Sequence, residues 1–550
     1  MRNDTLKVAV AFTAVAEDAM LDVCVSATLG DRPRMYKNAC LASLLLASST
    51  VLAVAPAAAS AASSAAAPSE AAVSAAKYAV ATYRNDVVDT LAKLVSFNTV
   101  ADPRYPSDQN PVHAAFKATL KAEAERMGLD YTDYGWTVVI GLGKGTERVG
   151  IVTHGDVQPV DPTKWKKSPF VLDRTSEPGK LIARGAEDDK GPIATALYAM
   201  KTIRDRQIPL TKRIELYVYM GEESDWGPLT EFLKTHVPPQ MSITLDAEYP
   251  VVTAEKGGGL VAVTVPKAGA QAPVEGDAYI AAFAGGSFNT QIPEDAEALV
   301  ANATPQIEGQ IRARGAQHEG MTYTYTWQGK DLAVRAKGLS AHSSKPQEGV
   351  NAVSMLADAL AVRPWANTTA GGVVNYLNEM VGTGYYGEKF GSGAGNIAYR
   401  DKFMGPLTFK PTVIRQLDDG IEVAINVRRP QGKTGTQLTD EINAALSQWQ
   451  ARQVPLTNIK VGVRDPWVLN DAPQVPTLLA TFAYFTGMKD AKPVAIGGGT
   501  NSRLFPNAVS FGPSMPGQKY SGHSEHEFIT TKQLLLNLQM YTAVLVELAR

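Results

Sequence analysis

The sequence predicts an α/β fold in which a mostly parallel sheet is flanked by helices, and three observations support this class. Apolar runs typical of strands alternate with segments of helical spacing, which is the pattern of a parallel sheet. The chain has 550 residues, more than one ordinary domain, so we expect two lobes. Its composition, 45% hydrophobic and 20% charged, is typical of a soluble protein with a large core. A formal net charge of -2 without a basic run argues against nucleic-acid binding.

The N-terminus has the pattern of a secretory signal peptide. Basic residues at positions 32, 34 and 37 precede an apolar run from Leu41 to Val54, and the Ala-rich stretch after Pro56 offers cleavage sites around 57–59. The apolar run is short for a bilayer span, which makes a membrane anchor the weaker alternative. We therefore expect a periplasmic or secreted protein without a stable membrane anchor after processing. Translation would start at Met35, and the first 34 residues would be an over-extended gene start.

The cysteine content also fits export. Cys24 and Cys40 are the only cysteines, and both precede the expected cleavage site, so the processed protein has neither thiol nor disulfide. The Ala/Ser-rich residues 55–76 predict a disordered linker, with ordered structure starting near Lys77.

Beyond this linker, helices and strands are expected in alternation. Apolar residues at helical spacing predict one helix from Val80 to Val95 and a second over about residues 113–127. The further elements are a strand ending at His154, a helix opening at Gly191-Pro192, a strand ending at Glu222 and a strand ending near Asp246.

Ionisable side chains follow three of these strands. They are His154, the pair Glu222 and Glu223, and Asp246. Ligands of parallel α/β sheets bind beyond the carboxyl ends of the strands, where these side chains would meet. A cluster of carboxylates is usually solvated surface, but glutamates directly after an apolar strand are costly unless a cation receives them.

The histidines and the carboxylates together favour a metal site. The stretch RGAEDDKGP places three carboxylates side by side at 187–189, where they would repel one another without a cation. Asp156 follows His154 by two residues on the same side of a strand, so it can bind one ring nitrogen while the other meets a metal. His523 lies in the polar loop YSGHSEHEF, whereas His113 and His236 are interpreted as surface residues. Histidine and carboxylate ligands without cysteine suit zinc, with manganese or cobalt as alternatives.

Nine motifs in order carry a resemblance to a known family. The sequence resembles the co-catalytic zinc exopeptidases that include carnosinase, aminoacylase-1 and succinyl-diaminopimelate desuccinylase, and most closely the bacterial dipeptidase V type. The matching stretches span about residues 150–530 and read THGDVQPV, W…SPF, LIARGAEDDKGP, GEESDWG, LDAEYPVVTAEKG, GLSAHSSKPQEGVNA, INVRRP, GGGTNSRLFPNAVSFGP and GHSEHEFI.

The resemblance implies a centre of two divalent metal ions, with zinc favoured over manganese or cobalt. His154, Asp188 and Asp246 would hold one ion; Asp188, Glu223 and His523 would hold the other, with Asp188 bridging. The family often has a cis peptide after this aspartate, which here would join Asp188 to Asp189.

The remaining catalytic and binding roles also follow from the resemblance. Asp156 would orient His154, Glu222 would be the general base, and His342 would stabilise the oxyanion. Asn289 and Arg428 would contact the substrate, with Arg428 pairing with its C-terminal carboxylate.

The domain plan follows in the same way. Residues 1–76 would hold the over-extended start, signal peptide and linker, and residues 77–257 with 466–550 the zinc-exopeptidase catalytic domain. Residues 258–465 would form an inserted α+β lid, long enough to bring His342 to the site of its own chain. We therefore expect a monomer.

The expected function is hydrolysis of dipeptides or short peptides with a free C-terminal carboxylate. Deacylation of N-acyl amino acids by the same fold is the main alternative. A free α-amine would need an acidic partner, for which Asp189 and Asp225 are candidates. A catalytically inactive binding protein is a third possibility, against which the complete set of expected ligands and Glu222 argue.

Overall fold

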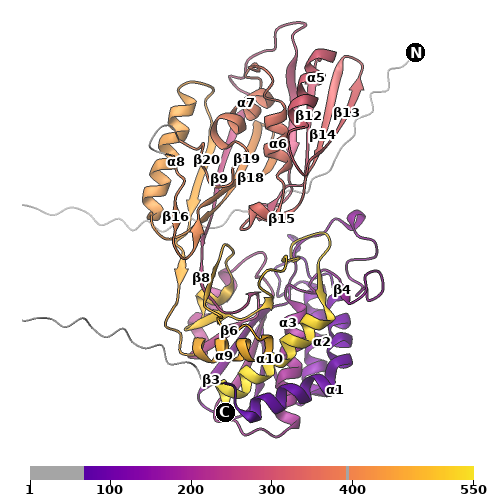
Figure 1. Ribbon diagram of the computed structural model, residues 1–550, viewed down its shortest axis with the longest axis vertical. Coiled ribbons are helices and arrows are strands. Elements are labelled where there is room, and N and C mark those ends of the chain that lie inside the picture. The colour runs from indigo at the N-terminus through magenta and orange to yellow at the C-terminus, as the bar shows by residue number, and fades with distance from the viewer. Residues whose placement is uncertain (1–66, 392–395) are drawn as a thin grey trace, which may run out of the picture. The chain divides into compact units, whose positions relative to one another are not determined.

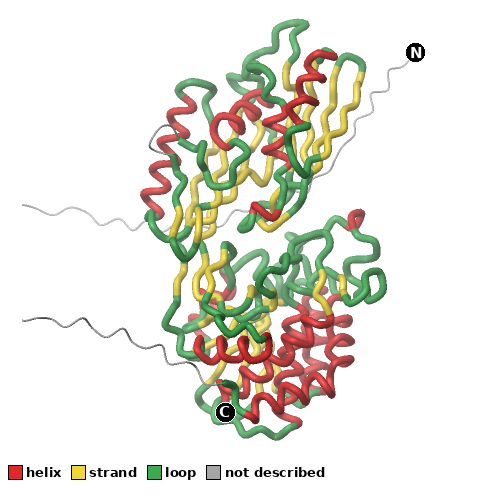
Figure 2. Tube along the Cα trace, viewed as in Figure 1, coloured by secondary structure: helices red, strands yellow, loops and turns green. Residues whose placement is uncertain are grey.

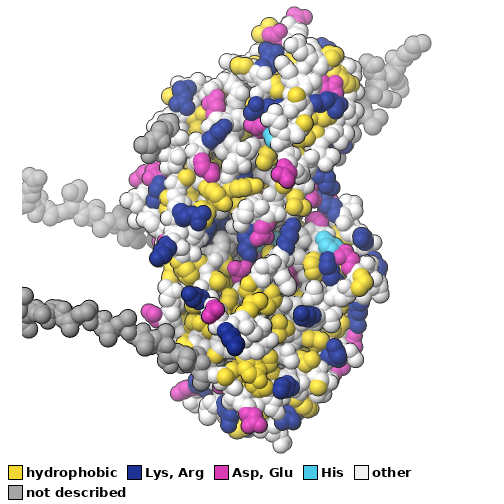
Figure 3. Space-filling model, viewed as in Figure 1, with side chains coloured by type: hydrophobic (Ala, Val, Ile, Leu, Met, Phe, Trp, Pro, Cys, Tyr) yellow, Lys and Arg dark blue, Asp and Glu magenta, His cyan; other side chains and the backbone are white. Residues whose placement is uncertain are grey.

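The structure is a computed structural model that describes residues 67–391 and 396–550 (Figure 1). The expected gene start, signal peptide and first part of the linker therefore lie outside the described residues. No helix in the described ranges is long and apolar enough to cross a bilayer. On the face drawn in Figure 3, acidic and basic side chains are interspersed, in keeping with the small net charge.

A nine-stranded sheet has the order β1-β2-β5-β3-β6-β23-β8-β21, with β22 paired to β8. Its central strands β5, β3, β6 and β23 pair in parallel, and antiparallel pairs lie toward both margins. This confirms the α/β class. The strands are β1 (Asp130–Asp133), β2 (Thr137–Leu142), β3 (Arg148–His154), β5 (Arg213–Tyr219), β6 (Met241–Thr244), β8 (Val252–Glu255), β21 (Trp467–Val468), β22 (Val494–Ile496) and β23 (Ala508–Ser510).

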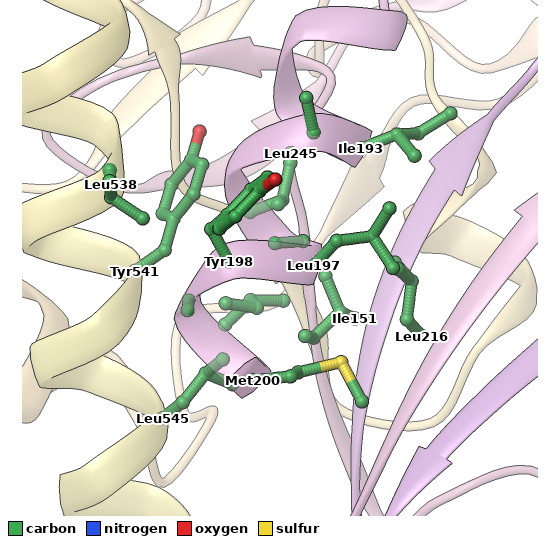
Figure 4. Packing of buried hydrophobic residues seen from close by; sticks show 14 of the residues in the cluster. Ile151, Ile193, Leu197, Tyr198, Met200, Leu216, Leu245, Leu538, Tyr541 and Leu545 are labelled. Carbon is green, nitrogen blue, oxygen red and sulfur yellow. The ribbon is translucent and has the colours of Figure 1, made fainter. Parts of the chain in front are cut away.

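Helices cover this sheet, and three of them pack against one another (Figures 1 and 2). The helix α3 is buried along most of its length, because it lies between strands on one side and α1 and α10 on the other. In Figure 4, Ile193 and Leu197 of α3 approach Ile151 and Leu216 of the strands, while Tyr541 lies on the facing α10. The helices are α1 (Glu70–Val95), α2 (Pro111–Arg126), α3 (Lys190–Asp205), α4 (Gly227–Thr235), α9 (Val475–Thr486) and α10 (Thr531–Ala549).

Order begins earlier than expected at the N-terminal end. The helix α1 starts at Glu70, seven residues before Lys77, because alanine is the strongest helix former and several alanines lie on one buried face. The main-chain N–H of Ser69 donates to Glu547 of α10 at 2.8 Å, which ties this end to the core. The C-terminal part of the Ala/Ser-rich segment is therefore helical.

Two strands end before the residues that were expected to end them. β5 ends at Tyr219, three residues before Glu222, because the N–H groups of Glu222 and Glu223 donate to Asp156 and not to a neighbouring strand. β6 ends at Thr244, two residues before Asp246. Both carboxylate segments are thus loops beyond the sheet.

A second, eight-stranded sheet is antiparallel throughout, with the order β13-β14-β12-β10-β18-β19-β9-β20. Burial alternates along β12 and β14, which is typical of a sheet with one covered face. We refer to this sheet and its helices as the lid. Its elements are β9 (Gly257–Pro266), β10 (Tyr279–Gly285), β12 (Asp295–Ala301), α5 (Pro305–Gly315), β13 (Thr322–Gln328), β14 (Asp331–Lys337), α6 (Ala352–Ala359), α7 (Thr369–Tyr376), β18 (Thr408–Gln416), β19 (Gly420–Arg429), α8 (Gly435–Gln450) and β20 (Thr457–Val463).

Candidate metal centre and active site

The end of β3 holds the first histidine. β3 ends at the buried His154, whose Nδ1 donates to the main-chain oxygen of Asp156 at 3.0 Å and so leaves Nε2 for another partner. The carboxylate of Asp156 lies beside the same ring nitrogen, with Oδ1 3.5 Å from Nδ1 of His154, and it has a second task. Its two oxygens accept the main-chain N–H groups of Glu222 and Glu223, each at 3.0 Å. Asp156 therefore orients His154 through its main-chain oxygen and its carboxylate, and the same carboxylate positions the glutamate loop.

Asp188 lies between two histidines. Its Oδ1 is 2.8 Å from Nε2 of His154, and its Oδ2 is 3.1 Å from Nε2 of His523. The buried Glu527 holds this loop by accepting the main-chain N–H groups of Glu187 and Asp188 at 2.9 and 3.0 Å. The peptide bond from Asp188 to the next residue is cis, as the resemblance implies.

The three adjacent carboxylates have different partners. Glu187 accepts the N–H and the hydroxyl of Ser521 at 2.8 and 2.5 Å, and burial raises the pKa of Glu187 to about 7. Asp189 is fully buried and accepts the main-chain N–H of His154 at 3.2 Å. Of the three, Asp188 is the one that faces both imidazoles.

Two groups of three side chains can each hold a metal ion. The first is His154, Asp188 and Asp246, and the second is Asp188, Glu223 and His523; within each group the ligand atoms lie within 4.8 Å of one another. Nε2 of His154 is 3.8 Å from Asp246, and Nε2 of His523 is 3.0 Å from Glu223. These nitrogen and carboxylate donors fit two divalent ions of the zinc, manganese or cobalt type, with Asp188 shared.

The negative charge of the carboxylates at this centre also favours the binding of cations. Asp188, Glu222, Glu223 and Asp246 surround two imidazoles. Burial raises the pKa of Asp246 well above its usual value, and the charge of Asp188 adds to the effect. Burial opposes ionisation of Asp188, but hydrogen bonds from the two imidazoles outweigh it and hold the pKa of Asp188 well below its usual value. Several carboxylates confined together are stable as anions when metal ions neutralise them.

Glu222 belongs to neither group of ligands. Its Oε1 is buried and has no hydrogen-bond partner among the described residues. Its main-chain oxygen accepts the indole N–H of Trp226 at 2.6 Å, which anchors the loop. Burial raises the pKa of Glu222 well above its usual value, and the charge of Asp246 raises it further. A carboxylate oxygen without a partner beside such a centre is suited to accept a proton from water.

His342 lies at the same centre and belongs to the lid segment, on the short strand β15 (Ala341–His342), which pairs with β11 (Gln291–Ile292) beside the eight-stranded sheet. The centroid of its ring lies 5.2 Å from that of His523. The main-chain N–H of Ser344 donates to Nδ1 of His342 at 3.2 Å, so a neutral ring carries its proton on Nε2. Burial lowers the pKa of His342 well below its usual value, and the charge of His523 lowers it further. His342 is therefore a neutral hydrogen-bond donor.

The two expected substrate-binding residues, Arg428 and Asn289, lie on different elements of the lid. Arg428 is buried on β19; its Nε donates to Asn426 at 3.1 Å and its Nη2 to Ser343 at 3.3 Å. Asn289 is half-buried in the turn before Gln291, which pairs with His342. Both residues thus lie close in the structure to the histidine segment of the lid.

Sequence reasoning missed several residues at this centre. Tyr520 donates its hydroxyl to Oδ2 of Asp188 at 2.5 Å, and the amide of Gln158 donates to Glu223 at 2.6 Å. Gln158 lies within the motif THGDVQPV and Tyr520 lies shortly before GHSEHEFI, and these positions were the signals that could have pointed to them.

The surface assignment of His113 was wrong. His113 is fully buried, with Nε2 lying 3.1 Å from the main-chain oxygen of Thr99. Its alanine-rich surroundings hid this, because the buried face of α2 also includes Phe116. His236 is half-buried, and its ring stacks on Phe232.

A hydrolytic metal centre at the edge of an α/β sheet, with a lid that carries a neutral histidine, defines a metal-dependent hydrolase. Residues 150–547 match Peptidase family M20/M25/M40, and the chain belongs to this family. It is a metallopeptidase, which confirms the expected enzyme class.

Similar proteins agree with the family and the fold. The chain is 28% identical over 479 residues to "Putative dipeptidase YtjP" of Bacillus subtilis, which covers 85% of this chain and 98% of that protein. It is 27% identical over 477 residues to "Beta-Ala-Xaa dipeptidase" of Lactobacillus delbrueckii, covering 85% and 97%. The structure of human carnosine dipeptidase 1 has the same fold, with a TM-score of 0.52, 13% identity, and coverage of 87% of this chain and 99% of that one.

Proposed function

We propose that the protein is a dipeptidase that hydrolyses dipeptides or short peptides with a free C-terminal carboxylate. The observation that supports it most is the pair of ligand groups that share Asp188 beside the unpartnered Oε1 of Glu222. Both relatives named above are called dipeptidases, which favours dipeptides over longer peptides as substrates.

The residues of the chain divide the reaction between them. Two divalent ions, of which zinc is favoured, would be held by the two ligand groups; when bound, they supply Lewis acidity that polarises the scissile carbonyl and lowers the pKa of water. Glu222 removes a proton from the attacking water as the C–O bond forms, and later delivers that proton to the leaving amine as the C–N bond breaks. The Nε2–H of His342 donates to the carbonyl oxygen as it gains negative charge.

Arg428 would set the length of the substrate. Its guanidinium can bind the C-terminal carboxylate with two hydrogen bonds and so position the scissile bond. A longer peptide presents a main-chain amide at that position, which the guanidinium binds less well.

Deacylation of N-acyl amino acids is the second candidate function, and one observation supports keeping it. The two acids considered for the α-amine have other partners: Asp189 is fully buried against His154, and the exposed Asp225 caps Gly227 at 2.8 Å. Neither acid is therefore assigned to the α-amine of a dipeptide. An N-acyl amino acid has no free α-amine and does not need such a partner.

Turnover decides between the two candidates. Metal-free enzyme is restored with zinc, manganese or cobalt and is given a panel of L-dipeptides, tripeptides and N-acetyl amino acids of matched C-terminal residue. The dipeptidase proposal expects kcat/KM for dipeptides to exceed that for N-acetyl amino acids by at least about tenfold, or about 1.4 kcal/mol. A preference for the N-acetyl compounds would replace it with the deacylase.

We also propose that the enzyme is exported, on the strength of the basic, apolar and Ala-rich pattern between residues 32 and 59. Expressed from Met35 in a bacterium, it should reach the periplasm shortened to a start near residues 57–65. An intact N-terminus in the cytoplasm, found by mass spectrometry, would contradict this.

A further inference from the structure

Two guanidinium groups lie close together near the candidate active site. Arg428 is 6% exposed, and its hydrogen bonds go to Asn426 and Ser343, neither of which is charged. Arg464 follows the last strand of the lid, and no residue in the described ranges gives its side chain a hydrogen bond or an ion pair. Neither guanidinium is therefore paired with a carboxylate of the described chain.

A glycine allows the two groups to approach each other. A Cβ placed on Gly258 would lie 2.9 Å from Nη2 of Arg464 and 3.4 Å from Nη1 of Arg428. Gly258 pairs with Arg428 across β9 and β19, and its carbonyl accepts the N–H of Arg464 at 3.0 Å. The main chain thus brings both arginines to one point, and any side chain at position 258 would displace the end of Arg464.

The neighbouring carboxylates offset the charge of this pair only in part. A third arginine, Arg503, is paired with the buried Glu255 at 3.2 Å, so those two charges largely offset each other. The other carboxylate that acts on Arg464 is that of Glu222, which makes no ion pair with either guanidinium. Burial lowers the pKa of Arg428 to about 10, and the charges of Arg464 and Arg503 add to the effect. Two like charges held this close are unfavourable unless an anion lies between or beside them.

Arg464 could avoid this repulsion, because its side chain is exposed and long. Its guanidinium lies instead 5.6 Å from the ring of Trp226, whose indole donates to the main chain of Glu222. Arg428 contacts Ser343, which follows His342. The arginine pair therefore borders both the base and the oxyanion histidine, where the C-terminal residue of a substrate would lie.

We infer that Arg464 binds the side-chain carboxylate of an acidic C-terminal residue, so that the enzyme prefers dipeptides ending in aspartate or glutamate. The inference rests on the proposed function, which assigns the α-carboxylate to Arg428. One α-carboxylate offsets one of the two positive charges. An aspartate or glutamate at the C-terminus carries two carboxylates on one residue and offsets both.

The experiment compares two substrates of almost the same size and shape, L-alanyl-L-glutamate and L-alanyl-L-glutamine. The wild-type enzyme should favour the glutamate by at least about tenfold in kcat/KM, since a hydrogen-bonded charge pair is worth that much. The Arg464→Met variant should bring this ratio to within about twofold of one, while its kcat/KM for alanyl-glutamine stays within about threefold of wild type. The Arg464→Glu variant should instead favour L-alanyl-L-lysine over alanyl-glutamine.

Two controls separate the charge effect from damage to the fold. Arg415→Met removes another exposed arginine of the lid, which pairs with Glu422, and should leave the substrate ratio unchanged. Gly258→Ala should lower the ratio by displacing Arg464, whereas Gly462→Ala, with nothing nearer than 4.0 Å to its added Cβ, should not. If Arg464→Met does not fold, the two glycine variants carry the test.

Three outcomes overturn the inference: a wild-type ratio near one, a ratio unchanged in both Arg464→Met and Gly258→Ala, or an equal loss on all dipeptides in Arg464→Met. The third would make Arg464 a positioning residue for the loop of Trp226 and Glu222. Failure of the wild type to hydrolyse any dipeptide would instead reject the proposed function.

Discussion

The regions built on the two large sheets contribute opposite kinds of groups to the candidate site. Loops beyond the nine-stranded sheet provide both sets of metal ligands and the carboxylate of Glu222. The lid provides a neutral hydrogen-bond donor, His342 on a short strand beside the eight-stranded sheet, and a cation, Arg428 on β19. Metal binding and proton transfer thus belong to one region, and stabilisation of negative charge belongs to the other. Substitutions of the metal ligands in the first region should therefore change metal content, and substitutions in the lid should not.

The largest effect is expected at Asp188, the one residue common to both ligand groups. Asp188→Ala should abolish detectable turnover and lower the content of both ions, because one carboxylate serves both groups. Elemental analysis of the purified variant measures this. Asp225→Ala removes an exposed carboxylate of the same region, outside both ligand groups, and should keep its metal. Full metal content in Asp188→Ala would reject the bridging role.

Glu222 sharpens the comparison, because it lies in the metal-binding region without being a ligand. Glu222→Gln should keep both ions and lose about 10²- to 10⁴-fold in kcat, since proton transfer alone is removed. The matched variant is Glu223→Gln, one residue along the same loop, which should lose metal because Glu223 belongs to the second group. Equal loss of metal in both variants would show that the roles of general base and metal ligand are wrongly assigned to Glu222 and Glu223.

His342 tests the lid side of the comparison. His342→Ala should keep its metal and lose about 10²- to 10³-fold in kcat, as expected for removal of one oxyanion donor. Since the ring lies 5.2 Å from His523 of the same chain, we propose that it acts without a partner subunit.

Mixing the inactive His342→Ala and Glu222→Gln proteins tests that proposal. No activity should return, and light scattering should give the mass of a monomer. Recovered turnover together with the mass of a dimer would show that a partner supplies the histidine.

The amino-acid sequence predicts the metal-binding region better than the lid, for a physical reason. Residues His154, Glu222 and Asp246 stand out because charged side chains follow apolar strands, a pattern that is local in sequence. His342 and Arg428 have no such local pattern, and only the resemblance to a family singles them out.

Contacts that depend on loop conformation were beyond sequence reasoning. The hydrogen bond from Tyr520 to Asp188 joins residues more than 300 positions apart, and the use of Asp156 as a main-chain acceptor follows from where the glutamate loop turns. The approach of Arg464 to Arg428 likewise needs the pairing of β9 with β19. Two strand ends were also misplaced, by two and three residues. After β5 the main-chain N–H groups of Glu222 and Glu223 donate to the Asp156 carboxylate, which takes the place of a neighbouring strand.

The smallest effect on catalysis is expected from substitutions that break the ion pairs between the two regions. Lys345 of the lid lies 2.7 Å from Glu248, and Lys164 lies 2.5 Å from Glu294 and 2.9 Å from Asp295 of the lid. All of these side chains are at least partly exposed, so each pair stabilises the contact between the two regions only weakly. Lys164→Met and Lys345→Met should each raise KM by about two- to fivefold at low salt and change kcat by less than about twofold.

The double variant and a salt series complete this test. The double variant should multiply the two effects on KM, because the pairs lie at separate places and share no residue. Salt should raise the KM of the wild type more than that of the double variant, since screening removes what the substitutions have already removed. Lys234→Met breaks the exposed pair with Glu231 inside one helix of the metal-binding region and should change neither constant. An unchanged KM in the double variant at low salt would show that these ion pairs do not hold the two regions together during catalysis.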